Sequence, residues 1–199
     1  MTWQEVPRQR RFFVTKHSAG MCGVGKFMAR WKQRENSHCP RCGAHEDAPH
    51  VWVWNGADAS NIWEQLIPSL ESWMSTTHTD PNVQHALIRF LWCWHDSMSV
   101  DEGATSDIQQ LIQEQWLFMG NMLLEGWVHQ DWQSIQQKYY SNLGSQRTGK
   151  CWVIALLKKS WDIAWDLWQH RNQILHEQEN AVTAQYMQSM DRQVLRAYR

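Results

Sequence analysis

Hydrophobic residues recur at three- and four-residue intervals over most of the chain beyond residue 57. The first such stretch begins at Ile62 and Trp63, and Pro68 marks a kink or break within it. The same spacing returns in four further stretches, at residues 83–94, 108–119, 127–139 and 151–176. A helix with one apolar face buries that face against other helices. The pattern therefore predicts an all-α, Trp-rich helical domain.

The N-terminal part of the chain has a different pattern, because glycines interrupt it and basic residues are frequent. It predicts one short element up to about Ser18, a glycine turn, and then a helix through about Arg34. Residues 36–49 read as a loop, and residues 50–54 either begin a helix or form a short strand. We therefore expect a basic N-terminal segment with a small C-x2-C insert over residues 1–56, followed by the helical domain over residues 57–199.

The longest predicted helix begins at Cys151 and contains no Gly or Pro up to residue 176. Trp161, Trp165 and Trp168 fall on one face of it, which predicts a core stripe, with a groove for a partner as the alternative. A polar stretch at residues 177–180 predicts a bend before a further amphipathic helix. With 15 Trp against five Phe and four Tyr, Trp provides most of the aromatic packing.

Charge is distributed unevenly along the chain, although the formal net charge is only −1. Residues 1–50 carry nine Lys and Arg and four Asp and Glu, whereas residues 51–146 carry two basic and eleven acidic residues. A basic segment beside an acidic one binds an external anion such as nucleic acid, or it docks on its own acidic neighbour. The acidic helices over residues 58–131 are the candidate neighbour.

The densest group of metal-binding residue types lies between His38 and His50. Cys39 and Cys42 stand at C-x2-C spacing before a glycine, which is typical of a zinc knuckle, and His50 is a natural third ligand. Structural Zn²⁺ takes four N or S ligands. His45 would complete the set, and His38 and Cys22 are other candidates. The alternative is that both cysteines are ordinary reduced thiols in a turn and that the histidines are solvated.

Five cysteines form an odd set, and only one pair of them is close in sequence. The N-terminus is polar and charged, and no run of 18 apolar residues occurs. We therefore predict a reduced, intracellular protein, in the nucleus or cytoplasm, with no membrane segment and with a metal site rather than a disulfide at the C-x2-C motif.

No motif in the sequence predicts catalysis or a small-molecule substrate. The run from Gly20 to Lys26 fits G-x-x-x-x-G-K, but Phe27 stands where a P-loop has Ser or Thr. Glu46 could serve a zinc hydrolase as general base only beside an open coordination position in a pocket. We therefore predict that the protein is not an enzyme.

Basic residues surround Trp31 and the C-x2-C motif. A single-stranded nucleic acid is held by cationic side chains at its phosphates and by aromatic rings at its bases. The alternative is a solvated basic face with Trp31 in the core. The candidate contacts are Arg30, Trp31, Lys32, Arg34 and Arg41.

Two stretches resemble a known family. The first runs from Gly23-Val24-Gly25-Lys26-Phe27-Met28 through Trp31, His38-Cys39-Pro40-Arg41-Cys42-Gly43 and Glu46-Asp47 to His50-Val51-Trp52. It resembles the zinc-binding segment C-terminal to the polymerase domain in reverse transcriptases of non-LTR retrotransposons. The family's closing cysteine is replaced by Trp54. A second stretch, Trp161, Trp165, Trp168, Arg171-Asn172 and Leu175-His176, resembles a helix of the same open reading frames.

The resemblance covers residues 20–55 and 150–176, and no Tyr-x-Asp-Asp polymerase motif is present. It implies a tail fragment or a domesticated remnant, whose knuckle contacts nucleic acid without catalysis. We therefore expect a nucleic-acid-binding tail with structural Zn²⁺ and single-stranded RNA or DNA as partner. The alternative is a helical protein–protein interaction module with a relic metal site.

Overall fold

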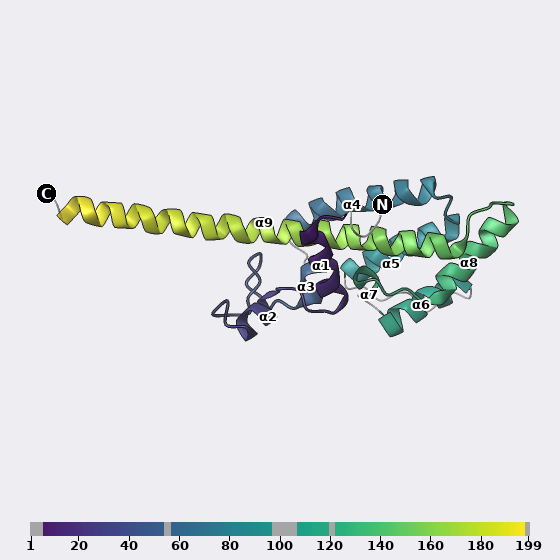
Figure 1. The fold of residues 1–199 in the computed structure, drawn as a ribbon, viewed down its shortest axis with the longest axis horizontal. Coiled ribbons are helices and arrows are strands. Elements are labelled where there is room, and N and C mark those ends of the chain that lie inside the picture. The colour runs from purple at the N-terminus through teal and green to yellow at the C-terminus, as the bar shows by residue number, and fades with distance from the viewer. Residues whose placement is uncertain (1–5, 54–56, 97–106, 120–121, 198–199) are drawn as a thin grey trace.

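The computed structural model describes residues 6–53, 57–96, 107–119 and 122–197. All the regular elements in these ranges are α-helices, so the predicted all-α class is confirmed (Figure 1). The helices are α1 (Arg8–Ser18), α2 (Gly25–Arg30), α3 (Ala48–Trp52), α4 (Ala57–Thr76), α5 (Pro81–His95), α6 (Asp107–Met119), α7 (Met122–Glu125), α8 (Gln130–Asn142) and α9 (Gly149–Ala197). Within these ranges, no helix combines the length and the apolar character needed to cross a membrane.

The long helix α9 is the axis on which the other elements assemble. α8 returns antiparallel along it, and α1, α3, α4 and α7 also contact it. Figure 1 shows the other helices gathered around the N-terminal part of α9, with its C-terminal part projecting from the body. α9 runs through residues 177–180 without interruption, so the predicted bend there is wrong.

Local signals explain some of the helix ends. Asp47 caps α3, because its carboxylate accepts a hydrogen bond from the backbone N–H of His50 at 3.1 Å. Of the two structures predicted for residues 50–54, a helix is present through Trp52, and Trp54 lies outside the described residues. α2 stops at Arg30, four residues before its predicted end, and Lys32 adopts a left-handed φ of 58° directly afterwards. Pro68 lies inside α4 and does not end it.

Tryptophan provides much of the core. The fully buried tryptophans Trp52, Trp63 and Trp132 come from three different helices. Trp165 and Trp168, from the predicted stripe on α9, are partly buried and pack against Phe13 of α1, at ring distances of 5.1 and 6.0 Å. One hydrophobic cluster thus includes side chains from residues 1–56 and from the helices that follow.

His17 of α1 is part of this core. Its ring stacks on Phe13 at 5.0 Å, meets Trp52 edge-on at 4.9 Å, and donates from Nε2 to the carbonyl oxygen of Leu124 at 2.6 Å. Burial lowers the pKa of His17 from 6.5 to about 4, although the hydrogen bond to Leu124 acts in the opposite direction. The imidazole is therefore neutral in the folded protein at neutral pH.

This burial predicts acid sensitivity. Because the folded-state pKa lies below the unfolded-state value, the stability contributed by neutral His17 is complete above about pH 6.5 and is lost as the pH falls toward 4. At pH 5 the expected loss is about 2 kcal/mol in the free energy of unfolding. Urea denaturation at pH 7.5 and pH 5 measures it. His17→Gln should reduce the difference between the two pH values by about 2 kcal/mol, and an unchanged pH dependence in that variant would refute the assignment.

Candidate metal centre

The loop between α2 and α3 folds into a tight knuckle. An antiparallel bridge pairs His38 with His45. Inside it, the N–H of Cys39 donates to the carbonyl oxygen of Ala44 at 2.7 Å, and the N–H of Gly43 donates to that of Cys39 at 2.9 Å. Gly43 has a φ of +75°, which a side chain would strain. The turn therefore requires glycine at position 43. It brings the side chains of Cys39 and Cys42 close together.

Three potential ligands converge at this turn. The ligand atoms of Cys39, Cys42 and His50 all lie within 4.8 Å of one another, so the cluster could hold a metal ion. The Sγ of Cys42 lies 3.3 Å from the Nε2 of His50, which stands in the first turn of α3. The backbone N–H of Arg41 donates to the Sγ of Cys39 at 3.4 Å. Such a bond stabilises a thiolate and so favours metal binding.

Burial differs among the three ligands. Cys39 is buried, His50 is half-buried, and Cys42 is exposed. Burial, and then the charge of Arg41, lowers the pKa of His50, which favours the neutral imidazole that a metal requires. Partial loss of solvation raises the pKa of the Cys42 thiol, so this cysteine must lose a proton when it binds a metal ion.

The other candidate ligands lie outside this cluster. The Nδ1 of His45 is 2.8 Å from the Oγ of Ser37. His38 is exposed, and Cys22 is buried in the core, where burial raises its thiol pKa to about 12. The structure thus brings Cys39, Cys42 and His50 together and leaves His45 aside.

Glu46 anchors the knuckle to α9. It is completely buried, and its two carboxylate oxygens accept hydrogen bonds from Nε and from one terminal nitrogen of Arg171, at 2.9 and 2.5 Å. One of these oxygens also accepts the N–H of Gly25 at 2.6 Å. Spacing rules cannot identify this pair, because 125 residues separate its members. A carboxylate held in this way is engaged on both oxygens and is not free to act as a base.

The hydrogen bond from the N–H of Gly25 to Glu46 also requires glycine at position 25. A Cβ atom at this position would lie 2.4 Å from the carbonyl oxygen of Ser37 and 3.1 Å from the Cβ of Glu46. The glycine therefore lets the start of α2 approach the loop closely enough for its N–H to reach Glu46.

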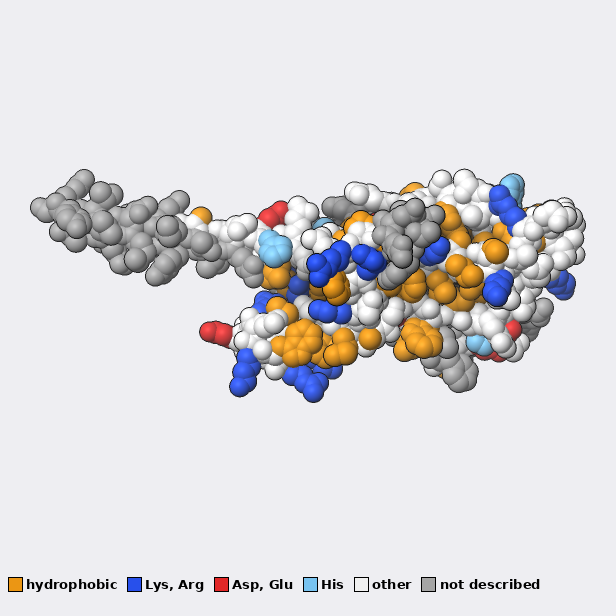
Figure 2. Space-filling view, viewed as in Figure 1, with side chains coloured by type: hydrophobic (Ala, Val, Ile, Leu, Met, Phe, Trp, Pro, Cys, Tyr) orange, Lys and Arg blue, Asp and Glu red, His pale blue; other side chains and the backbone are white. Residues whose placement is uncertain are grey.

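The predicted nucleic-acid contacts divide into two sets. Arg30 and Lys32 are exposed, and Trp31 is 39% exposed while stacking on Phe27 at 5.6 Å. Arg34 is half-buried, and the guanidinium of Arg41 donates to the carbonyl oxygen of Val51 at 3.1 Å. Figure 2 shows apolar side chains flanked by Lys and Arg over the region of α2. Arg30, Trp31 and Lys32 thus face solvent, whereas Arg41 is used to hold α3.

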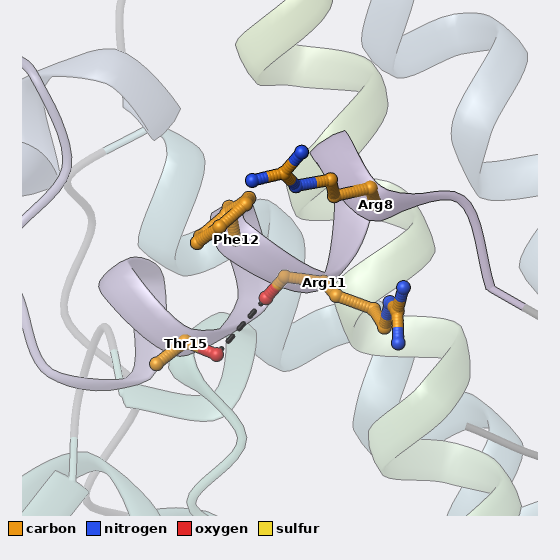
Figure 3. A pocket seen from close by; sticks show the side chains of 4 residues that line it. All are labelled: Arg8, Arg11, Phe12 and Thr15. Atoms are coloured by element: carbon orange, nitrogen blue, oxygen red, sulfur yellow. Dashed lines mark hydrogen bonds between the residues drawn. The ribbon is translucent and has the colours of Figure 1, made fainter. Parts of the chain in front are cut away.

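A second basic surface lies on α1 (Figure 3). Arg8, Arg11, Phe12 and Thr15 line a shallow pocket there. The Arg8 guanidinium lies 5.3 Å from the centre of the exposed Phe12 ring. On the opposite side of this helix, Arg10 pairs with Asp162 of α9. Among the described residues, the ion pairs that join the basic segment to the helical part go to α9.

Comparisons of the chain with protein-family models, with curated proteins and with solved structures gave no match. The geometry of the knuckle and its surroundings is therefore the basis for the functional proposal.

Proposed function

We propose that the chain is a non-catalytic nucleic-acid-binding domain stabilised by zinc, similar to the C-terminal zinc-binding region of reverse transcriptases from non-LTR retrotransposons. The observation that carries the proposal is the Cys39, Cys42 and His50 cluster, which lies in one knuckle next to exposed basic and aromatic side chains of α2. Arg171 engages both carboxylate oxygens of Glu46, the residue that a zinc hydrolase would use here as general base, and this supports a non-catalytic role.

The donor set favours zinc. Two thiolates and an imidazole are ligands typical of structural Zn²⁺. In a tetrahedron with Zn–S near 2.3 Å and Zn–N near 2.05 Å, the S···N edge is about 3.5 Å. The distance of 3.3 Å between Cys42 Sγ and His50 Nε2 is close to this value. Zinc therefore fits between these atoms with little movement of the loop.

Zinc content is the first measurement. The purified, untagged protein should contain Zn²⁺ in the knuckle, and Cys39→Ser/Cys42→Ser should lower its Zn²⁺ content by about one equivalent per chain. Cys151→Ser is the matched control, because Cys151 is exposed on α9 and lies outside the cluster. A protein that is metal-free when purified and takes up no zinc would favour a helical interaction module with a relic metal site.

The exposed part of the basic segment suits a single strand. Arg30 and Lys32 flank Trp31, so two cations and one aromatic face are available over three successive residues. Cations neutralise phosphates, and an exposed aromatic ring stacks on an unpaired base. The net charge of +5 over residues 1–50 adds a favourable field for a polyanion.

Nucleic-acid binding is tested with a fluorescent single-stranded oligonucleotide followed by anisotropy at several salt concentrations. Trp31→Ala should weaken binding by about 1–3 kcal/mol, which is roughly 5- to 150-fold. Arg30→Ala/Lys32→Ala should weaken binding and reduce the slope of log K against log salt by about 0.7 for each phosphate that these two cations neutralise.

Lys138→Ala/Lys150→Ala is the matched control, since both residues are exposed and lie at the α8–α9 end of the molecule. This variant removes the same charge and should change binding far less. Equal losses in the two double variants would indicate a non-specific charge effect. The absence of salt-dependent binding in the unmodified protein would overturn the proposed function.

A further inference from the structure

A second group of metal-ligating side chains lies far from the knuckle, between α6 and the start of α8. The ligand atoms of Glu114, His129 and Asp131 all lie within 4.8 Å of one another. His129 Nδ1 is 3.7 Å from an oxygen of Glu114 and 3.5 Å from an oxygen of Asp131. Both distances exceed the range of about 2.7–3.2 Å for an N–H···O hydrogen bond. The three groups converge without binding one another directly.

The nitrogen at the centre of this group is held toward the backbone only by a long contact. His129 caps α8, and its Nδ1 lies 3.4 Å from the backbone nitrogen of Asp131. This distance also exceeds the usual hydrogen-bond range, and Nδ1 has one lone pair, so a metal ion here takes that lone pair in place of the cap. The Oε1 of Glu114 accepts a hydrogen bond from the side chain of Gln110 at 2.9 Å, and its Oε2 faces His129.

The backbone around the group is fixed. Gln115, next to Glu114 in α6, is fully buried. Its side chain accepts the N–H of His129 at 2.8 Å and donates to the carbonyl oxygen of Trp127 at 3.2 Å. The loop that carries His129 is thus tied to the helix that carries Glu114, so two of the three ligands are preorganised.

In the described part of the chain, no Lys or Arg pairs with these two carboxylates. The sequence contains no Lys or Arg between Arg89 and Lys138, although seven Asp and Glu lie in that interval. Within the described ranges, the salt-bridge partner of Glu114 and of Asp131 is His129 alone. Both carboxylates are partly exposed, so a cation from solution can reach them.

We propose that Glu114, His129 and Asp131 bind a divalent transition-metal ion through one imidazole nitrogen and two carboxylate oxygens. For metal–ligand bonds near 2.05 Å, the edge of a tetrahedron is about 3.3 Å, so the observed separations of 3.5 and 3.7 Å need to contract only slightly. A mixed N and O donor set favours the zinc, cobalt and nickel class over Mg²⁺ or Ca²⁺. Water completes the coordination.

Cobalt(II) distinguishes this site from the knuckle, because thiolate ligands give a sulfur-to-metal charge-transfer band and N and O ligands do not. Calorimetric titration of the full-length Cys39→Ser/Cys42→Ser protein with Co²⁺ should still show one bound equivalent, without that band. Adding Glu114→Gln should raise its Kd at least about tenfold. This variant keeps the His129 side chain at the start of α8, so it removes one ligand and leaves the imidazole present.

His85→Gln is the matched control, because His85 is exposed on α5 and outside the cluster, and it should leave the Kd unchanged. His129→Gln should also raise the Kd at least about tenfold. The proposal is overturned if the protein without the cysteine pair binds no Co²⁺, or if Glu114→Gln binds it as tightly as its parent. Failure of the zinc knuckle would instead appear as a missing charge-transfer band in the unmodified protein, so the two failures are distinguishable.

Discussion

Replacement of Arg171 by Met should lower the free energy of unfolding by about 3–5 kcal/mol. The substitution keeps much of the side-chain volume but leaves the completely buried carboxylate of Glu46 without its cationic partner. The cost comes chiefly from this uncompensated charge, because an ionised group far from water is expensive unless it is paired. Urea denaturation followed by Trp fluorescence at neutral pH measures the change.

The partly exposed ion pair between Arg10 of α1 and Asp162 of α9 provides a matched control, because it also joins the N-terminal segment to α9. Arg10→Met removes a guanidinium that contacts α9 from α1, but both partners are partly exposed, so the loss should be at most about 1 kcal/mol. The double variant Glu46→Gln/Arg171→Met should recover part of the loss, since it leaves no buried charge. If Arg171→Met is no more destabilising than Arg10→Met, the anchoring role assigned to the pair is wrong.

The Glu46–Arg171 pair also joins the two stretches that carried the family resemblance. Glu46 lies in the knuckle stretch, and Arg171 lies in the Trp-containing stretch of α9. The sequence presented these stretches as separate similarities with a long unassigned region between them. In the structure they are one unit, in which a buried ion pair holds the loop of the candidate metal site against α9. The position of the knuckle therefore depends on tertiary contacts as well as on any metal.

Helix periodicity predicts the all-α architecture, because most of the helices carry an apolar face that extends over several turns. Predicted helix boundaries differ from the structure where tertiary packing outweighs a local signal. Pro68 removes one backbone hydrogen bond, yet α4 continues through it, with Ile67 and Leu70 buried on either side. Burial of that face outweighs the lost bond. α2 instead ends before its predicted limit at Arg34. Its last residue is Arg30, and Lys32 adopts a left-handed backbone conformation just beyond it.

The local part of the site was predictable, and its surroundings were not. Cys39, Cys42 and His50 lie within twelve residues, so turn geometry alone brings them together. Charge alone, by contrast, could not separate Arg41, whose guanidinium binds a backbone carbonyl, from the exposed Arg30. The direction of a long side chain depends on neighbours that are distant in sequence. The sequence alone does not identify these neighbours, because they are set by the fold.

Gln136 illustrates the same dependence on distant partners and supports a second large effect. It is fully buried in α8, and its amide bridges the turn between α4 and α5. The side-chain oxygen accepts the N–H of Asp80 at 3.0 Å, and the side-chain nitrogen donates to the carbonyl oxygen of His78 at 3.2 Å. One turn later, Tyr140 donates its hydroxyl to the carbonyl oxygen of Thr77 at 2.6 Å. Two side chains of α8 thus satisfy three backbone groups of this turn.

Gln136→Leu should therefore lower the free energy of unfolding by about 1–3 kcal/mol, because it removes the partner of one backbone N–H and one C=O in a partly buried turn and leaves an apolar side chain against them. Gln133→Leu is the matched control, since Gln133 lies on the exposed face of the same helix and should change stability by less than about 0.5 kcal/mol. Urea denaturation of both variants measures the difference. Equal stabilities would mean that the backbone groups of the α4–α5 turn find other hydrogen-bond partners. The stabilising role assigned to Gln136 would then be wrong.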